Sequence, residues 1–192
     1  MAYDAIKFFH VLAVVFMSAP LYNLIVVNER VLFGKAPFAV DRYFEKIIRG
    51  AASRCYIFQL TALVSGLTLL PLGGFGWSSL FDNGVLLAKL LLLIALMVLL
   101  SVVNFRIQPA IDKLLSQVDG EEIPQDIAKQ IAPLRITRKR LAALCLFIVI
   151  TTVLLGLQVI ARFGASLTGL LIVLAAFFSW RVYKSPVRFG WF

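Results

Sequence analysis

The chain contains one histidine, His10, and three cations that could act with it: Lys7, Lys89 and Arg162. Lys7 precedes His10 by three residues, which places both on one face if the segment is helical. A neutral imidazole is a good axial ligand for haem iron, and nearby lysine or arginine would suit the haem propionates. The alternative is that His10 donates a hydrogen bond to a neighbouring helix while the lysines extend to the lipid headgroups. The residues alone leave both interpretations open.

A second ligand for the same ion is not evident. Met17 follows His10 by seven residues, about 10 Å along a helix axis, and Met97 would lie deeper in its span than Lys89. A haem at His10 would therefore be five-coordinate or take its other ligand from another chain. The two methionines also suggest an alternative in which they bind Cu(I), since thioethers are suitable ligands for that ion. The sequence has a single histidine and no paired carboxylates in an apolar run. It therefore lacks a nucleophile combined with a general base and a residue that orients this base, which weighs against an enzyme.

These residues lie in a very apolar chain. Its 192 residues are 61% hydrophobic and 15% charged, whereas a soluble domain has about 45–50% apolar and about 25% charged residues. Helices that cross a bilayer need about 20 residues, and the chain has five apolar runs of about this length, at 5–27, 50–72, 85–105, 141–161 and 165–181. The runs lack the alternation of a β-barrel. The sequence therefore predicts an all-α, polytopic transmembrane helical bundle in which 1–192 form a single transmembrane domain.

The charge pattern predicts the orientation of this bundle. The net charge is +9, and most of the 19 Lys and Arg residues fall in 28–49, in 106–140 and after residue 180. By the positive-inside rule, the two basic loops and the C-terminus are cytoplasmic and the N-terminus lies outside, and the expected location is a bacterial inner membrane. His10, Lys7, Lys89 and Arg162 then share one layer near the outer surface. The loops lack the aromatic interleaving of nucleic-acid binders, so nucleic acid is not an expected partner.

Within 28–49, apolar residues recur at the spacing of a helix, with charged residues between them. The apolar positions are Val40, Phe44, Ile47 and Ile48, and the charged ones are Arg42, Glu45, Lys46 and Arg49. This pattern predicts either a short amphipathic helix on the membrane surface or an extension of the second span. The cations at 138–140 are expected to contact anionic lipid headgroups. Cys55 and Cys145 are expected to be small packing residues.

Three short segments carry a resemblance to known proteins: AIKFFHVLAVV at 5–15, LAKLLL at 87–92 and NFRIQP at 104–109. Together they resemble a bacterial group of small polytopic proteins that includes the copper-resistance protein D family, the HemJ-type protoporphyrinogen oxidases and uncharacterised relatives. The resemblance covers about 5–160 and implies a four-span core, to which the fifth span would be an addition. It also implies a haem b or metal role near His10, with Lys89 beside it.

Two departures from the HemJ-type pattern concern the reaction. FMSAP at 16–20 stands where those proteins have a stretch containing tryptophan and glycine, and VLL at 98–100 stands where they have a further histidine. We therefore expect a non-catalytic subunit of a bacterial electron-transfer or photosynthetic complex, in contact with lipid and other membrane subunits, that holds haem b or a (bacterio)chlorophyll magnesium through His10. The alternatives are a protoporphyrinogen oxidase and a copper or small-cation transporter.

Overall fold

The computed structural model describes residues 1–30, 37–161 and 164–184, without the side chains of 22–30 and 160–161. All secondary structure in these residues is helical. The helices are α1 (Ala2–Arg30), α2 (Phe38–Leu72), α3 (Ser79–Asp82), α4 (Gly84–Val102), the π-helix η1 (Val103–Ile107), α5 (Gln108–Leu115), α6 (Gln125–Ala161) and α7 (Ala165–Lys184). The prediction of five spans is confirmed, because five helical stretches of the described chain are long and apolar enough to cross a membrane.

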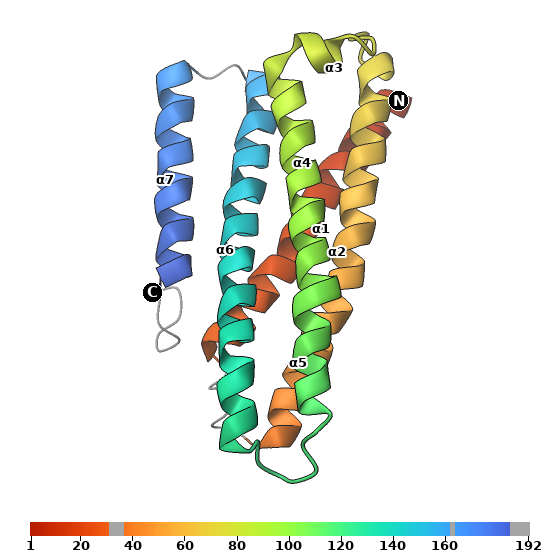
Figure 1. The fold of residues 1–192 in the computed structure, drawn as a ribbon. Helices are drawn as coiled ribbons and strands as arrows, with labels where there is room; N and C mark the ends of the chain where they lie inside the picture. Colours follow the sequence, from red (N-terminus) through yellow and green to blue (C-terminus); the bar gives the residue numbers. More distant parts are fainter. Residues whose placement is uncertain (31–36, 162–163, 185–192) are drawn as a thin grey trace.

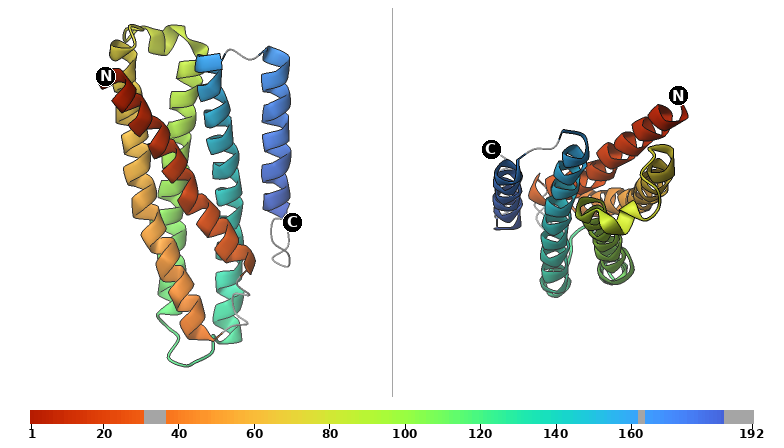
Figure 2. Two further views of the ribbon diagram at one scale, coloured as in Figure 1. Left: turned by 180° about the vertical axis from the view of Figure 1, so that it is seen from behind. Right: turned by 90° about the horizontal axis from the view of Figure 1, so that it is seen from above.

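The helices form an elongated bundle. α2, α4 and α6 run side by side, α1 crosses them obliquely, and α7 stands beside α6 away from the others (Figures 1 and 2). The chain begins at the end of the bundle that carries α3, and α7 runs from that end toward the opposite one (Figure 1). We call the first the α3 end and the second the α5 end. The middle of the bundle is held by a core of packed side chains from α1, α2, α4 and α6.

The two segments predicted as basic loops are largely helical. α2 begins at Phe38, so the residues at 38–49 extend the second span rather than form a separate surface helix. Within 106–140, α5 and the first half of α6 are helical as well. The reason is an apolar contact at the α5 end, where Ile107, Ile111 and Leu115 pack against Ile131. Burying these side chains favours two packed helices over exposed coil.

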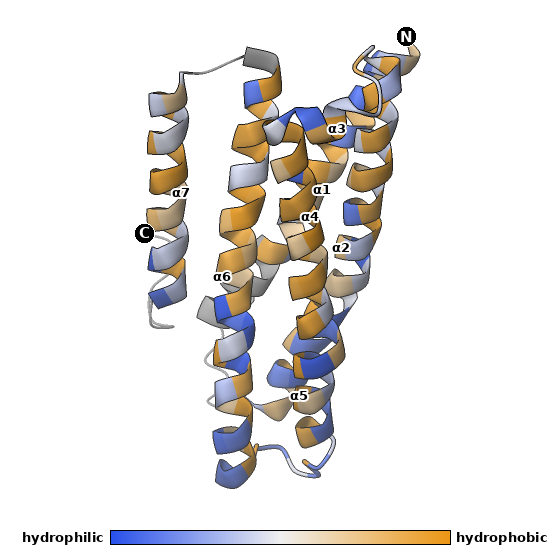
Figure 3. Ribbon diagram, turned by 45° about the horizontal axis from the view of Figure 1, so that its top comes forward, coloured by the Kyte–Doolittle hydropathy of each residue, from blue (hydrophilic) through white to orange (hydrophobic). Residues whose placement is uncertain are grey.

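The long helices extend beyond the hydrocarbon core of a bilayer. At 1.5 Å per residue, the 35 residues of α2 and the 37 of α6 span about 50–55 Å, against about 30 Å of hydrocarbon. The hydrophilic residues gather at the α5 end, on α2, α5 and α6 (Figure 3). The first turns of α2 and α6 therefore lie outside the hydrocarbon, in the headgroup layer and the adjoining water.

Prolines lie inside these helices without ending them. Pro20 lies inside α1 and Pro133 inside α6. Pro109 follows the π-helix η1, whose wider turn accommodates a residue that has no N–H to donate. At the α3 end the chain turns through Gly74 and Gly76, both with positive φ, before Asn83 caps α4 by accepting hydrogen bonds from Val85 and Leu86.

Candidate functional site

The first candidate site surrounds His10 on α1, where this helix packs against α2. The Nδ1 atom of His10 lies 3.0 Å from the Oγ atom of Ser65. Next to it, Gly66 leaves room for the imidazole, since a Cβ at this glycine would lie 3.1 Å from the His10 Cε1 atom. The missing side chain of Gly66 thus allows the imidazole to lie against the α2 backbone, where Ser65 can reach its Nδ1 atom.

The hydrogen bonds of Ser65 favour one tautomer of His10. A serine hydroxyl has one proton, and Ser65 donates it to the backbone carbonyl of Thr61. With its proton directed to Thr61, the Ser65 oxygen is able to accept a hydrogen bond from an Nδ1–H group of His10. A neutral imidazole that donates from Nδ1 keeps a lone pair on Nε2, which is the arrangement found when histidine binds a metal.

Lys89 lies in the same layer, on α4. Its ammonium nitrogen is 3.5 Å from the position that a Cβ of Gly156 on α6 would take. It is also near enough to His10 to act on it electrostatically. We call these five residues the His10 layer: His10, Ser65, Gly66, Lys89 and Gly156. His10 and Lys89 thus both lie in the part of the bundle near the α3 end, on helices that are far apart in the sequence.

Lys7, another predicted site residue, does not join this layer in the structure. Lys7 lies one turn from His10 on α1, and its ammonium group is 5.9 Å from the ring centroid of Tyr3. Arg162 lies outside the described residues. Met17 is only 1% exposed and packs in the central core with Cys55 and Cys145. Because Met17 is two turns from His10 and enclosed, it does not supply a second ligand to an ion at His10.

Gln59 is a buried polar residue that the sequence pattern does not identify. It lies on α2 between Cys55 and Ser65, is 2% exposed, and donates to the sulfur of Cys55 at 3.6 Å. Its Oε1 atom has no hydrogen-bond partner among the described residues. An unpaired buried acceptor is costly, so this atom marks a polar position beneath the His10 layer. In the described ranges, no group of three or more His, Cys, Asp or Glu side chains could hold a metal ion.

A second polar site, which the sequence patterns do not predict, lies at the α5 end. Arg138 on α6 is completely buried and bonds through its guanidinium to both carboxylate oxygens of Glu45 on α2, at 2.6 and 3.1 Å. Arg135 bonds to Glu45 and to Asp41, at 3.0 Å each. Gln108 bridges Glu45 and Arg138. We call these residues the buried charge cluster: Asp41, Glu45, Gln108, Arg135 and Arg138.

This cluster corrects two expectations. The sequence pattern places Glu45 on an exposed polar face and Arg138 and Lys139 at lipid headgroups, but all three are buried. Arg140 alone of the three cations at 138–140 is exposed, and its guanidinium stacks 5.1 Å from the ring of Tyr183. The signal in the sequence is the spacing: acids four apart on one helix and arginines three apart on another each lie on a single face.

The charges of the cluster keep Glu45 ionised. This residue precedes the apolar part of α2 and lies outside the hydrocarbon. Burial alone would raise the pKa of the Glu45 carboxyl, but the hydrogen bond and charge of Arg138, together with Gln108 and Arg135, hold this pKa below its usual value. Two acids and two arginines balance in charge. The cluster is therefore suited to joining α2, α5 and α6 rather than to exchanging protons.

The two glycines of the His10 layer give a matched test of its packing. We expect Gly66→Leu to lower the free energy of unfolding by about 1–3 kcal/mol, because the new side chain must displace the His10 ring. Gly156→Ala is expected to be neutral or stabilising by up to about 1 kcal/mol, since its Cβ would make an ordinary contact and alanine favours helix. Unfolding of the detergent-solubilised chain in SDS, followed by circular dichroism, measures both. Equal effects of the two substitutions would contradict the close approach of His10 to Gly66.

Comparison with known proteins identifies no relative of the chain. No family model, curated protein or solved structure matches the chain.

Proposed function

We propose that the chain is an integral membrane subunit that holds one haem b through the Nε2 atom of His10. The observation that carries this proposal is the hydrogen-bond relay from Thr61 through Ser65 to the Nδ1 atom of His10. This relay would hold the imidazole in one orientation and one tautomer, as the second shell of a metal ligand does. The same hydrogen bond would join α1 to α2 in a chain without haem, and the absorption spectrum of the purified chain distinguishes the two roles.

The residues near His10 would also suit the other parts of a haem. The ammonium of Lys89 lies in the same layer and would pair with a haem propionate. When bound, a b-type haem supplies one-electron transfer. His10 would orient the iron, Ser65 would raise the basicity of the imidazole, and Lys89 would hold the carboxylate end of the ring. The magnesium of a (bacterio)chlorophyll could bind to the same imidazole. That pigment, however, lacks the pair of free propionates with which Lys89 would pair.

A single protein ligand also supports a role within a larger assembly. Met17 is enclosed two turns away from His10, so this chain would supply His10 as a ligand and any other protein ligand would come from another subunit. The candidate ligand, His10, lies within the helical bundle, and the connections between the helices are short. We therefore propose an accessory place in a bacterial electron-transfer or photosynthetic complex, where the haem lies near the interface with a partner. The absorption spectrum of the purified chain beside His10→Ala tests haem binding.

We also propose that the bundle is oriented with the N-terminus outside a bacterial cytoplasmic membrane and the C-terminus inside, as the positive-inside rule predicts. Two variants that each add one exposed cysteine test this, since the native Cys55 and Cys145 are buried. Ser78→Cys at the α3 end is expected to react with a membrane-impermeant maleimide in intact cells. Gln117→Cys at the α5 end should react only after permeabilisation. The reverse labelling pattern would invert the orientation and place the His10 layer in the inner leaflet.

A further inference from the structure

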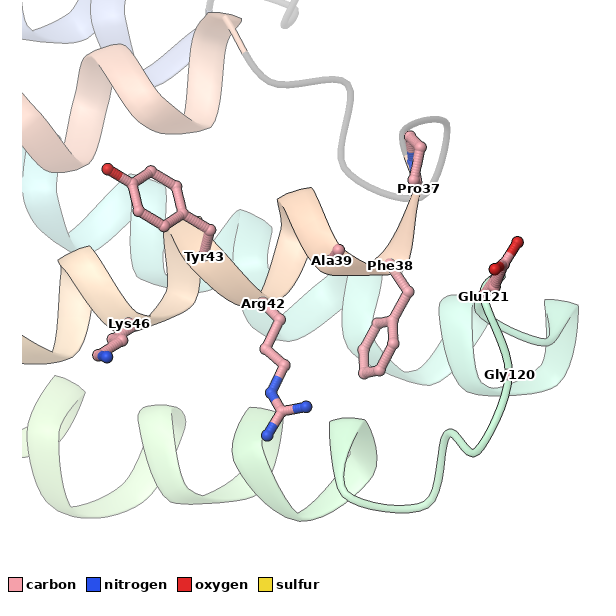
Figure 4. A pocket seen from close by; sticks show the side chains of 8 residues that line it. All are labelled: Pro37, Phe38, Ala39, Arg42, Tyr43, Lys46, Gly120 and Glu121. Carbon is pink, nitrogen blue, oxygen red and sulfur yellow. The ribbon is translucent and has the colours of Figure 1, made fainter.

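A cavity at the α5 end lies outside both polar sites. Its volume is about 590 Å³, within the range of about 300–1,000 Å³ that is usual for small-molecule sites. The first turns of α2 form one wall, and the connection between α5 and α6 closes the other through a hydrogen bond from the Phe38 amide to the Glu121 carbonyl. The cavity residues are Pro37, Phe38, Ala39, Arg42, Tyr43, Lys46, Gly120 and Glu121 (Figure 4).

The cavity carries unbalanced positive charge. The two acids on this part of α2, Asp41 and Glu45, face inward and are neutralised by arginines of α6. Arg42 and Lys46 remain on the outer side of the helix, and neither forms an ion pair with any residue that the structure describes. Figure 4 shows both side chains extending to the same side of α2, whereas the Glu121 carboxylate points away from them.

The cavity extends from the headgroup layer into the adjoining water, with Lys46 within this layer and Arg42 beyond it. Lys46 and Arg42 precede Gly50, where the apolar part of α2 begins, by four and eight residues, or about 6–12 Å along the axis. The headgroup and interfacial region on each side of a bilayer is about 5–8 Å thick. Tyr43, 62% exposed, lies between the two cations, as tyrosines do at the level of the headgroups. A ligand of the cavity is therefore met at the membrane surface.

We propose that this cavity binds the phosphate of an anionic phospholipid headgroup, with Arg42 and Lys46 as its cationic contacts. Phosphate is the common feature of the anionic headgroups, and two cations against one acid that points away from them match its charge. The geometry needs no contribution from the His10 layer. The site is thus independent of the haem proposal, and either can fail without the other.

The full chain in a nonionic detergent provides the test, titrated by calorimetry with short-chain phosphatidylglycerol, short-chain phosphatidylcholine and inorganic phosphate. Saturable binding of phosphatidylglycerol is expected, with much weaker binding of the other two. Arg42→Gln combined with Lys46→Gln should weaken phosphatidylglycerol binding about 10- to 30-fold. The matched control combines Lys113→Gln with Lys129→Gln, which removes two exposed cations at the same end that do not line the cavity. Binding by this control should equal that of the wild type.

Three results would overturn the proposal. Equal binding of phosphatidylcholine and phosphatidylglycerol would show that the anionic headgroup is not recognised. Displacement of the lipid by inorganic phosphate at similar concentration would make free phosphate the ligand. Equal losses in the cavity variant and in the Lys113/Lys129 control would show only a general attraction between a basic protein and an anion.

Discussion

Replacing Arg138 by methionine is expected to lower the free energy of unfolding by about 3–5 kcal/mol, a larger change than either glycine substitution in the His10 layer should cause. Arg138 is fully buried and bonds to both oxygens of Glu45 and to Gln108. Without it, the Glu45 carboxylate would keep only Arg135 and Gln108, in surroundings that water does not reach. Most of the cost is that of a buried charge left incompletely paired, rather than the strength of one ion pair.

Arg140→Met is the matched control, because it removes the same charge from the same helix two residues away. Arg140 is exposed and stacks on Tyr183, and such an exposed contact contributes about 0.5–1 kcal/mol. Unfolding of both variants in SDS, followed by circular dichroism, gives the comparison. If Arg138→Met were no more destabilising than Arg140→Met, Arg138 would not be paired inside the bundle.

A double substitution separates charge imbalance from loss of packing. Glu45→Met together with Arg138→Met removes one charge of each sign and leaves Asp41 paired with Arg135. We expect the double variant to recover much of the stability lost by Arg138→Met, because a balanced apolar replacement of a buried ion pair is often close to neutral. A double variant that is less stable than both single variants would show that the shape of these side chains determines stability, rather than their charge balance.

The second large effect is expected at His10. His10→Ala should remove the Soret band of the purified chain, because the proposed iron ligand is lost while the fold around Ser65 remains. Ser65→Ala should keep the band but weaken haem affinity by about tenfold, since it removes the hydrogen bond that orients the ligand. Lys7→Ala is the control, because Lys7 lies one turn away toward Tyr3 and outside the His10 layer. Loss of haem in Lys7→Ala would move the site away from the His10 layer.

The sequence is sufficient to predict the membrane architecture, because each span is a long apolar run whose backbone can be satisfied only by helix. Counting residues from the predicted ends is also enough to place His10 and Lys89 at similar depth. The sequence does not show what His10 touches. Ser65 and Gly66 are ordinary residues for a membrane helix, and their role arises only from the way in which α1 crosses α2.

The buried charge cluster escapes prediction for a different physical reason. Charged residues beside an apolar run are usually solvated, and the sequence pattern therefore favours surface positions for Arg138 and Glu45. The two residues are 93 positions apart in the chain, so neither segment alone indicates that the other neutralises it. Asp41 and Glu45 share one face of their helix, and so do Arg135 and Arg138. This spacing is the only sequence feature that distinguishes the buried charges from the exposed ones on these helices.

The most direct test of haem ligation is the absorption spectrum of His10→Gly, purified with haem and measured with and without added imidazole. We predict that the wild type shows a Soret band, that His10→Gly lacks it, and that free imidazole restores it by occupying the space beside Ser65 and Gly66. A wild-type chain that takes up no haem, or a His10→Gly chain whose band is as strong as that of the wild type, would contradict the assignment of His10 as the iron ligand.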